Sequence, residues 1–433
     1  MAVATEEALP PKRIPLRHVI AVYIGNGLEF YDFLTFAFFA VYIAPNFFPG
    51  SNPSTSLLKT LATFGAGFLT RPVGAIVIGG LGDKMGRKPA MVLSFTLMGI
   101  AIVGLALTPP FAKIGVFAPA LVLFFRLLQG FALGGEVGPT TAYMAEAAPT
   151  HRRGLYLSLQ YATQDGAVLI AGIIATFLAA KLSTEQLSAW GWRVAMLIGA
   201  TAVPFGLWVR QTLPETFARG SAPPLPPAEP RRNPHLRIVV LGLMMLTAGT
   251  IGSYTLNYMT TYAIDTLGLP ATIGFGLLIL NGAVSIIFET TSGFLSDKFG
   301  RKPVMLVPAV LLVCSIVPCF WVIAHHASIT ALYGAEAVMA AFASLASVPV
   351  IVTITESLPP EIRSGAVATI YAFAISIFGG STQFVIKLLL TSTKNPLAPA
   401  YYWTGAALMG LVAMSLVKES APSKRRDSGI SAG

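Results

Sequence analysis

Residues 79–88 read GGLGDKMGRK, and residues 293–302 read GFLSDKFGRK. Each stretch follows a long apolar segment and precedes another, so each predicts a short polar turn between two helices. The glycines permit a tight turn, and the basic residues suit the water beside anionic headgroups at a membrane face. Because the same pattern occurs twice, about half a chain apart, the sequence predicts two related halves.

The composition indicates a membrane protein. Charged residues make up only 11% of the 433 residues, whereas about a quarter is usual in soluble proteins. The apolar segments are long enough for twelve spanning helices of roughly 20 residues each. We therefore predict an all-α membrane protein with twelve transmembrane helices in two pseudo-symmetric six-helix bundles. The net charge of +10 comes from basic residues spread between the apolar segments, which does not fit a nucleic-acid-binding stripe.

The predicted bundles are separated by the proline-rich stretch SAPPLPPAEPRRNPH, residues 221–235. Proline and charge at this density are typical of an extended linker. The predicted organisation is an N-terminal tail at 1–16, a first bundle at 17–212, a linker at 213–236, a second bundle at 237–417 and a C-terminal tail at 418–433.

The basic residues also predict the orientation. Most of the 29 lysine and arginine residues fall in segments on one side of the predicted membrane, the side that holds both termini. Cytoplasmic segments carry this excess of positive charge, so we expect both termini in the cytoplasm. The first residues are polar and lack a small-residue cleavage site, so we expect no removable signal peptide.

Five ionisable residues, among them Glu136 at a depth of roughly 15 Å, are expected near the middle of the membrane, where a charge is costly and marks a functional candidate. At 1.5 Å per residue, Glu29 and Arg71 lie about 18 Å deep, Asp32 about 22 Å and Arg126 about 30 Å. Glu29 and Asp32 are three residues apart and share a helical face, so their repulsion favours a proton on one of them. Both are candidate proton carriers. The alternative is that one acid only tethers its helix to a neighbour.

Arg71 and Arg126 are candidates for binding a substrate carboxylate, because a guanidinium group binds a carboxylate through two parallel hydrogen bonds. The alternative is a permanent ion pair with Glu29 or Asp32. Other polar residues could line the same cavity, although a glutamine can also serve as a helix-to-helix hydrogen bond and a tyrosine as an interfacial anchor. These candidates are Gln129, Gln160, Gln164, Tyr254, Asn257 and Tyr258.

The repeat extends past the two turns. Residues 146–154 read EAAPTHRRG, and residues 356–365 read ESLPPEIRSG. Aligning their first glutamates places Glu336 at the position that Arg126 occupies in the first half. The sequence assigns no role to Asp165, Glu289 or Glu336. Lys387 lies near the end of a predicted helix, and we expect its side chain to extend towards water.

Nothing in the sequence predicts an enzyme or a metal site. There is no Ser/His/Asp set with catalytic spacing and no Cys/His pattern with metal-ligand spacing. The stretch GDKMGRK is not a phosphate-binding loop, because that loop needs four residues between its first glycine and a Gly-Lys-Ser/Thr sequence.

Two further stretches narrow the interpretation. Residues 25–33 read GNGLEFYDF, and residues 126–146 read RLLQGFALGGEVGPTTAYMAE. Together with PTHRRG at 149–154, WGWR at 190–193 and LPET at 213–216, they resemble the metabolite:proton symporter family of the major facilitator superfamily, whose signature turn the two repeated stretches resemble. The resemblance extends from about Arg17 to Val417. It implies alternating-access symport of a small metabolite in the bacterial inner membrane, by a monomer that uses the proton as coupling ion and needs no other cofactor.

The resemblance also implies residue roles. Asp32 and Arg126 would belong to the proton-coupling site, and the two turns would act as gates. The stretches FLTRPVG (68–74), LQYATQ (159–164) and IFGGSTQF (377–384) look most like those of citrate and 2-oxoglutarate transporters. The residues expected to form the gates are Asp83, Arg87, Glu146, Arg153, Asp297 and Arg301.

Two departures from the family pattern leave an alternative open. Val137 stands where members often carry an aromatic residue, and Asp165 adds an acid where an uncharged residue is expected. If Glu29, Asp32, Glu136 and Asp165 are all ionised, these four acids outnumber the two arginines, Arg71 and Arg126. Either some are protonated at rest, or the substrate carries a positive charge, as proline and betaine do. We therefore expect a citrate or 2-oxoglutarate symporter, with a proline/betaine or shikimate symporter as the alternative. A membrane sensor that binds without transporting is disfavoured by the two intact turns.

Overall fold

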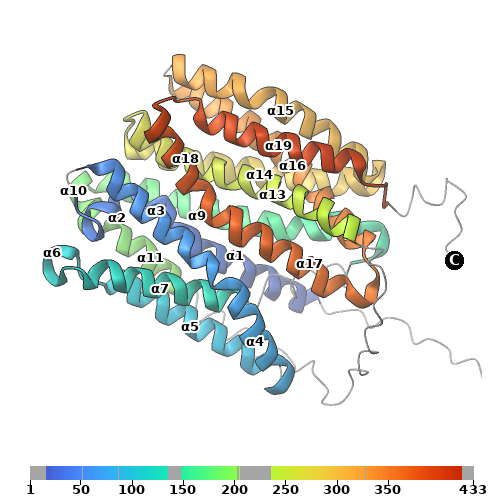
Figure 1. The fold of residues 1–433 in the computed structure, drawn as a ribbon, viewed down its shortest axis with the longest axis horizontal. Helices are drawn as coiled ribbons and strands as arrows, with labels where there is room; N and C mark the ends of the chain where they lie inside the picture. Colours follow the sequence, from blue (N-terminus) through green and yellow to red (C-terminus); the bar gives the residue numbers. More distant parts are fainter. Residues whose placement is uncertain are drawn as a thin grey trace, which may run out of the picture.

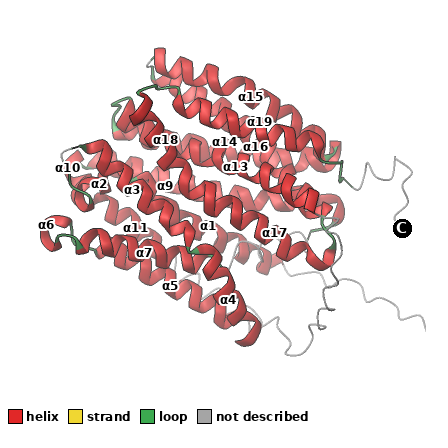
Figure 2. Ribbon diagram, in the orientation of Figure 1, coloured by secondary structure: helices red, strands yellow, loops and turns green. Residues whose placement is uncertain are grey.

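The computed structural model describes residues 16–50, 52–85, 87–134, 148–201, 204, 236–326 and 328–421. Every regular element within these residues is a helix, as Figure 2 shows. The prediction of an all-α fold is confirmed for this part of the chain.

The helices of the first half run from α1 to α11. Their bounds are α1 (Leu16–Phe38), α2 (Ala40–Phe47), α3 (Pro53–Leu69), α4 (Arg71–Met85), α5 (Arg87–Leu107), α6 (Phe111–Ile114), α7 (Phe117–Leu133), η1 (Thr150–Arg152), α9 (Arg153–Lys181), α10 (Thr184–Gln186), η2 (Leu187–Gly191) and α11 (Trp192–Ala200).

The helices of the second half run from α13 to α19. Their bounds are α13 (Leu236–Thr261), η3 (Tyr262–Thr266), α14 (Ala271–Phe299), α15 (Arg301–His325), α16 (Ile329–Ser357), α17 (Pro360–Ala374), η4 (Ile375–Gly379), α18 (Gly380–Thr393) and α19 (Ala398–Leu416).

Successive helices combine into rods that fit a membrane. Within the described residues, seven helices are long and apolar enough to span one, and the pair Tyr23–Phe38 and Ala40–Phe47, bent by 63°, makes an eighth candidate. Counting α1–α2, α3–α4, η2–α11, α13–η3 and α17–η4–α18 once each, and leaving out the short α6, α10 and η1, the described helices form twelve successive rods. This number agrees with the predicted twelve.

The two halves lie side by side along their helices. In Figure 1 the blue-to-green helices of the first half lie mostly below the yellow-to-red helices of the second. Two long contacts join them, α9 with α14 and α3 with α18. The end of the bundle where α14 ends at Phe299 and α15 begins at Arg301 is called the motif end below. The other end, where α14 begins at Ala271, is called the opposite end.

Glycines allow the halves to approach closely. A Cβ atom on Gly65 of α3 would lie 2.3 Å from the carbonyl oxygen of Gly380, where α18 begins. At the motif end, a Cβ atom on Gly154 of α9 would lie 2.5 Å from the carbonyl oxygen of Gly293 of α14. Small residues of this kind let membrane helices pack backbone to backbone.

Replacing Gly154 with alanine should therefore destabilise the contact at the motif end. Because the new methyl group meets backbone rather than a movable side chain, we expect a loss of about 1–3 kcal/mol. The measurement is the thermal unfolding midpoint of the purified protein in detergent. Gly405→Ala is the matched control, because a Cβ atom there meets no heavy atom within 4 Å. Equal midpoints for the two variants would contradict the close packing of α9 on α14.

One side-chain expectation is wrong. Lys387 of α18 does not extend towards water but is buried, with its Nζ atom 2.6 Å from Oδ2 of Asp265 in η3. The reason is that the π-helical turn that ends the α13 rod places a carboxylate within reach of α18. A charge that is buried in this way needs a partner of opposite sign, which Asp265 supplies.

Candidate functional site

A cavity of about 150 Å³ lies between the two halves. The first half contributes α1 and α9 to its wall, and the second half contributes α13 to α17, η4 and α19. Halves that both contribute to one central cavity are the arrangement in which transporters hold substrate near the middle of the membrane. The polar or aromatic residues of the wall include Tyr161, Gln164, Asp165, Tyr254, Asn257, Asn281, Ser285, Glu289, Ser344, Ser347 and Tyr371.

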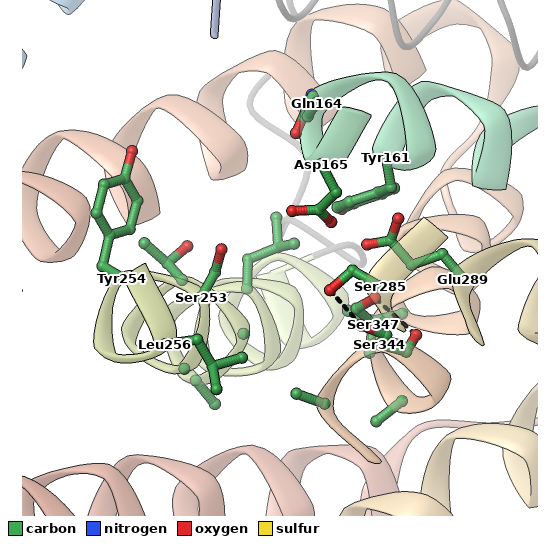
Figure 3. Close-up of a pocket in the computed structure, with 18 of the residues that line it drawn as sticks. Tyr161, Gln164, Asp165, Ser253, Tyr254, Leu256, Ser285, Glu289, Ser344 and Ser347 are labelled. Carbon is green, nitrogen blue, oxygen red and sulfur yellow. Dashed lines mark hydrogen bonds between the residues drawn. The ribbon is translucent and has the colours of Figure 1, made fainter. Parts of the chain in front are cut away.

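Two carboxyl groups face one another across this wall. Asp165 projects from α9 and Glu289 from α14, as Figure 3 shows. Their helices touch beside the backbone of Asp165, because a Cβ atom on Gly282 of α14 would lie 2.7 Å from the carbonyl oxygen of Asp165. Among the described residues that line the cavity, these two are the only charged ones, and none is a lysine or arginine.

Hydroxyl and amide groups of the second half continue the polar wall. Ser344 of α16 donates a hydrogen bond to Oγ of Ser285 on α14 at 3.0 Å, and Ser285 donates to Oδ1 of Asn281 at 3.4 Å. Oδ1 of Asn257 on α13 is buried and has no hydrogen-bond partner within the described part of the chain. The wall therefore offers polar groups that a ligand could satisfy.

Gln164 lines the cavity and also joins two helices of the first half. Its Nε2 atom donates to Oδ1 of Asn26 on α1 at 3.3 Å, and Nδ2 of Asn26 donates to the carbonyl oxygen of Gln160 at 3.2 Å. Gln160 is buried nearby, outside the described lining of the cavity. Both predicted roles of Gln164, cavity wall and helix-to-helix bond, are thus compatible with the structure.

Two arginines and four phenylalanines, Phe33, Phe36, Phe64 and Phe68, form a cluster in the first half. The guanidinium carbon of Arg71 on α4 is 4.3 Å from the ring centroids of Phe33 and Phe68. The guanidinium carbon of Arg126 on α7 is 4.2 Å from the centroid of Phe33 and 4.9 Å from that of Phe64. Both cations thus lie against the same ring of α1, where aromatic faces attract them. This set is called the arginine cluster below.

Arg126 is fully buried and pairs with uncharged groups. It donates to Oε1 of Gln129, to the carbonyl oxygen of Phe33 at 3.3 Å and to that of Phe64 at 3.5 Å. Within the described residues no carboxylate forms an ion pair with Arg126, and its Nε atom has no hydrogen-bond partner. Gln129 therefore lies in the cluster, as a partner of Arg126.

Tyr254 separates the arginine cluster from the cavity. It lines the cavity from α13, and its ring packs 5.7 Å from Phe68 and 6.4 Å from Phe64, centroid to centroid. The predicted wall residues Tyr254 and Asn257 are thus placed at the cavity. Tyr254 thus packs on Phe64 and Phe68, whose rings contact the two guanidinium groups.

Asp32 lies apart from the arginines. Its side chain is 3% exposed, and a Cβ atom on Gly199 of α11 would lie 2.0 Å from its Oδ1 atom. That oxygen has no hydrogen-bond partner among the residues that the structure describes, and no ion pair joins Asp32 to Arg126 there. The side chain of Glu29 lies outside the described part. Proton coupling by Asp32 and Glu29 stays a prediction.

Two residues of the second half lie in its core. Tyr258 packs in a buried cluster with Tyr262 and Met339 and is outside the described lining of the cavity. Glu336 of α16 is fully buried, and neither of its carboxylate oxygens has a hydrogen-bond partner within the described ranges. The expected contact between Tyr258 and a substrate stays a prediction.

The predicted gate of the second half is an ion-pair network at the motif end. Nη1 of Arg301 lies 2.6 Å from Oδ1 of Asp297, and Nη2 lies 3.0 Å from Oε1 of Glu356. Asp297 also accepts hydrogen bonds from the backbone N–H groups of Gly154 at 2.9 Å and Leu155 at 3.0 Å. These N–H groups belong to the first turn of α9 and lack partners within that helix, so a carboxylate stabilises them. Asp297 thereby joins the second half to the first.

Glu419 supports the same end of the molecule. Its carboxylate accepts hydrogen bonds from the backbone N–H groups of Arg301 and Lys302, both at 2.9 Å, and so caps α15. Burial raises the pKa of Glu419, but hydrogen bonds from four backbone N–H groups outweigh that effect, and its pKa lies below the ordinary value. Glu419 could not be singled out from the sequence, because its partners are backbone groups.

The equivalent gate of the first half is outside the described part. This applies to Glu146 and to the side chains of Asp83 and Arg87. Arg153 is half-buried at the start of α9. The part played by Glu356 in the second gate could have been found from the sequence, because the repeat aligns it with Glu146, which was a gate candidate.

Family profiles match both halves of the chain, and relatives match most of its length. The family profile described as Major Facilitator Superfamily matches residues 22–290, and the profile described as Sugar (and other) transporter matches residues 230–424. The chain is 33% identical to a citrate-proton symporter of Klebsiella pneumoniae over 91% of this chain and 90% of the relative. It is 34% identical to the alpha-ketoglutarate permease of Escherichia coli (strain K12) over 91% of each chain.

More distant proteins differ in what they carry. The chain is 31% identical to a putative proline/betaine transporter of Staphylococcus aureus over 94% of this chain and 89% of the relative. A crystal structure of a D-xylose-proton symporter superposes with a TM-score of 0.74 over 94% of this chain and 98% of that one, at 18% identity. At that identity the likeness concerns the fold alone.

Proposed function

The chain belongs to the major facilitator superfamily, and from this premise we propose that it is a multi-pass proton-coupled symporter of a small organic acid. Citrate and 2-oxoglutarate are the proposed substrates, since relatives that cover most of the chain are named for them. The proposal includes a monomer in the bacterial inner membrane with both termini in the cytoplasm, the proton as coupling ion, and transport rather than catalysis.

The observation that carries the proposal is the buried Arg126. A guanidinium group that is removed from water is stabilised best by a carboxylate. The structure gives Arg126 an amide and two carbonyl oxygens instead, and a second cation, Arg71, lies against the same Phe33 ring. In this proposal, a substrate carboxylate supplies the negative charge that the described part of the cluster does not give Arg126.

Access to the cluster runs through Tyr254. Because Tyr254 lines the cavity and packs on Phe64 and Phe68, a rotation of its side chain would connect the cavity with the two guanidinium groups. Substrate held there would touch both halves, and the halves would rock about it. Proton binding at Asp32 is the proposed partner step, because this acid is buried in the same half as Arg126.

Alternating access also needs contacts that can open at either end. At the motif end, Asp297 binds the first N–H groups of α9. At the opposite end, the Phe39 ring packs 4.8 Å from the Phe275 ring of the second half, centroid to centroid. In the proposed cycle these two contacts break alternately while substrate stays between the halves.

A second candidate is a zwitterion such as proline or betaine. The observation that favours it is the charge pattern: the cavity carries two acids, and the arginine cluster packs against Tyr254 of the cavity wall. The positive group of such a substrate would suit the two acids, and its negative group would suit the arginine cluster. One relative is named as a putative proline/betaine transporter.

Competition for uptake distinguishes the candidates. Purified protein in proteoliposomes is given labelled citrate and, in parallel, an excess of unlabelled 2-oxoglutarate, shikimate, proline or betaine. We expect uptake of citrate that 2-oxoglutarate inhibits and betaine does not. Uptake of labelled betaine or proline, with none of citrate or 2-oxoglutarate, would overturn the organic-acid proposal in favour of the zwitterion.

A further inference from the structure

Asp165 and Glu289 form an acidic pair that the proposed substrate site does not use. Asp165 belongs to the first half and Glu289 to the second, and their carboxyl groups face each other in the cavity wall (Figure 3). The helices that carry them, α9 and α14, form the most extensive contact between the halves. Any change in the interaction between the two groups therefore acts directly on the contact that must change during transport.

Glu289 carries an unsatisfied acceptor. The residue is only 4% exposed, it lines the cavity, and its Oε2 atom has no hydrogen-bond partner within the described residues. A buried carboxylate oxygen in this position needs a donor, because leaving it unpaired is costly. The donor that the site lacks is a hydrogen on one of the two carboxyl groups, or a cation between them.

The surroundings favour a proton over a positively charged side chain. The titratable groups that face the pair along the described lining are tyrosines: Tyr161 of α9, Tyr254 of α13 and Tyr371 of α17. The other lining residues are uncharged: apolar or hydroxyl side chains, and the amides of Gln164, Asn257 and Asn281. Two carboxylates that share a site without a cation cannot both be ionised at little cost, so one of them keeps a proton.

We propose that Asp165 and Glu289 are a shared proton site, in which one proton held between the two carboxyl groups keeps α9 and α14 together and its loss separates them. The proton comes from water on the side of higher proton concentration and forms an O–H bond on one carboxyl group, which donates a hydrogen bond to the other. It returns to water on the other side. The two negative charges then repel each other in surroundings of low dielectric constant.

This inference rests on the proposed function, because it adds a second coupling site to a proton symporter. It places one coupled proton at the interface between the halves, away from Asp32. A proton carried across a difference of about one pH unit sustains about tenfold accumulation of substrate. Loss of this site should therefore lower proton-driven accumulation about tenfold while leaving substrate binding in place.

The test uses Glu289→Gln in proteoliposomes with labelled citrate and 2-oxoglutarate. Glutamine keeps the size of the side chain and supplies a permanent N–H donor, so it mimics the protonated state. We expect exchange of internal for external substrate, which needs no net proton movement, to persist. Accumulation driven by an inward proton gradient should fall about tenfold, and Asp165→Asn should have the same effect.

Glu336→Gln is the matched control, because Glu336 is also a buried acid without a hydrogen-bond partner among the described residues, but it is not part of the described cavity wall. It should keep gradient-driven accumulation. Infrared difference spectra of detergent-purified protein between acidic and alkaline pH give a readout that needs no substrate. One protonated-carboxyl component of the wild-type spectrum should be absent from that of Glu289→Gln and retained in that of Glu336→Gln.

The outcomes separate the two proposals. Wild-type protein that accumulates neither labelled acid would count against the proposed substrates, whereas the infrared band would still report on the pair. Wild-type accumulation that Glu289→Gln matches would overturn the shared proton site and leave the proposed function intact. Equal losses in Glu289→Gln and Glu336→Gln would also overturn it, because the effect would then follow from neutralising any buried acid.

Discussion

Replacing Arg126 with methionine should lower the uptake of labelled citrate by about a hundredfold, since two charge-assisted hydrogen bonds to a carboxylate would be lost. The same change should leave the thermal unfolding midpoint in detergent unchanged or higher. Arg126 is fully buried and has no ionised partner within the described residues. An apolar side chain of similar length therefore removes a desolvated charge without leaving another charge unpaired.

Two further variants sharpen this prediction. Arg126→Lys keeps the charge but not the planar fork, so we expect uptake between those of the wild type and Arg126→Met. Lys59→Met removes an exposed charge from α3 and should change nothing. Wild-type uptake by Arg126→Met would show that Arg126 does not bind substrate. A large fall in its unfolding midpoint would show instead that Arg126 serves the fold.

The second large effect is expected at the motif end. Arg301→Met should destabilise the protein by about 3–5 kcal/mol, because it removes one partner of a buried ion-pair network. Arg301 is 1% exposed, and the carboxylates of Asp297 and Glu356 that it binds are 11% and 4% exposed. Without the guanidinium group, both carboxylates lose their ionised partner while they stay buried.

The measurement is again the thermal unfolding midpoint, with Lys298→Met as the control. Lys298 lies in the same turn but is exposed, so its loss should cost little. Arg301→Lys should lie between the two, because a lysine cannot bind both carboxylates through a planar fork. Equal midpoints for Arg301→Met and Lys298→Met would contradict the importance of this network.

The helices could be predicted because their signal is local. Long apolar segments and the repeated turn of residues 79–88 and 293–302 gave twelve helices and two halves, and the described rods agree. The bend of 63° between α1 and α2 was not predicted. It falls within a continuous apolar segment, where no proline or glycine marks the break at Phe39.

The site was predicted only in part, because depth in the membrane does not fix which way a helix faces. Asp32 and Phe33 are neighbours at the same depth, but successive residues of an α-helix point about 100° apart. Phe33 faces both arginines, and Asp32 accordingly faces Gly199 of α11. The expected pairing of Asp32 with Arg126 needed the rotation of α1, which the sequence does not give.

For the same reason, the acidic pair of Asp165 and Glu289 could not be predicted as a pair. Asp165 departed from the family pattern, and Glu289 was an acid in a predicted span without a partner. Each residue was therefore unusual at the level of the sequence. Their proximity depends on which faces of α9 and α14 pack together, and these residues are far apart in the sequence.

The most direct test of proton-coupled organic-acid symport starts with proteoliposomes that hold equal concentrations of labelled citrate, or of labelled 2-oxoglutarate, inside and outside. An inward proton gradient is then imposed, and a pH-sensitive dye inside the vesicles reports proton entry. Proton-coupled symport predicts net accumulation of one of the acids above its external concentration, with proton entry in step. Equal internal and external concentrations of both acids throughout, with no proton entry beyond that of empty vesicles, would contradict it.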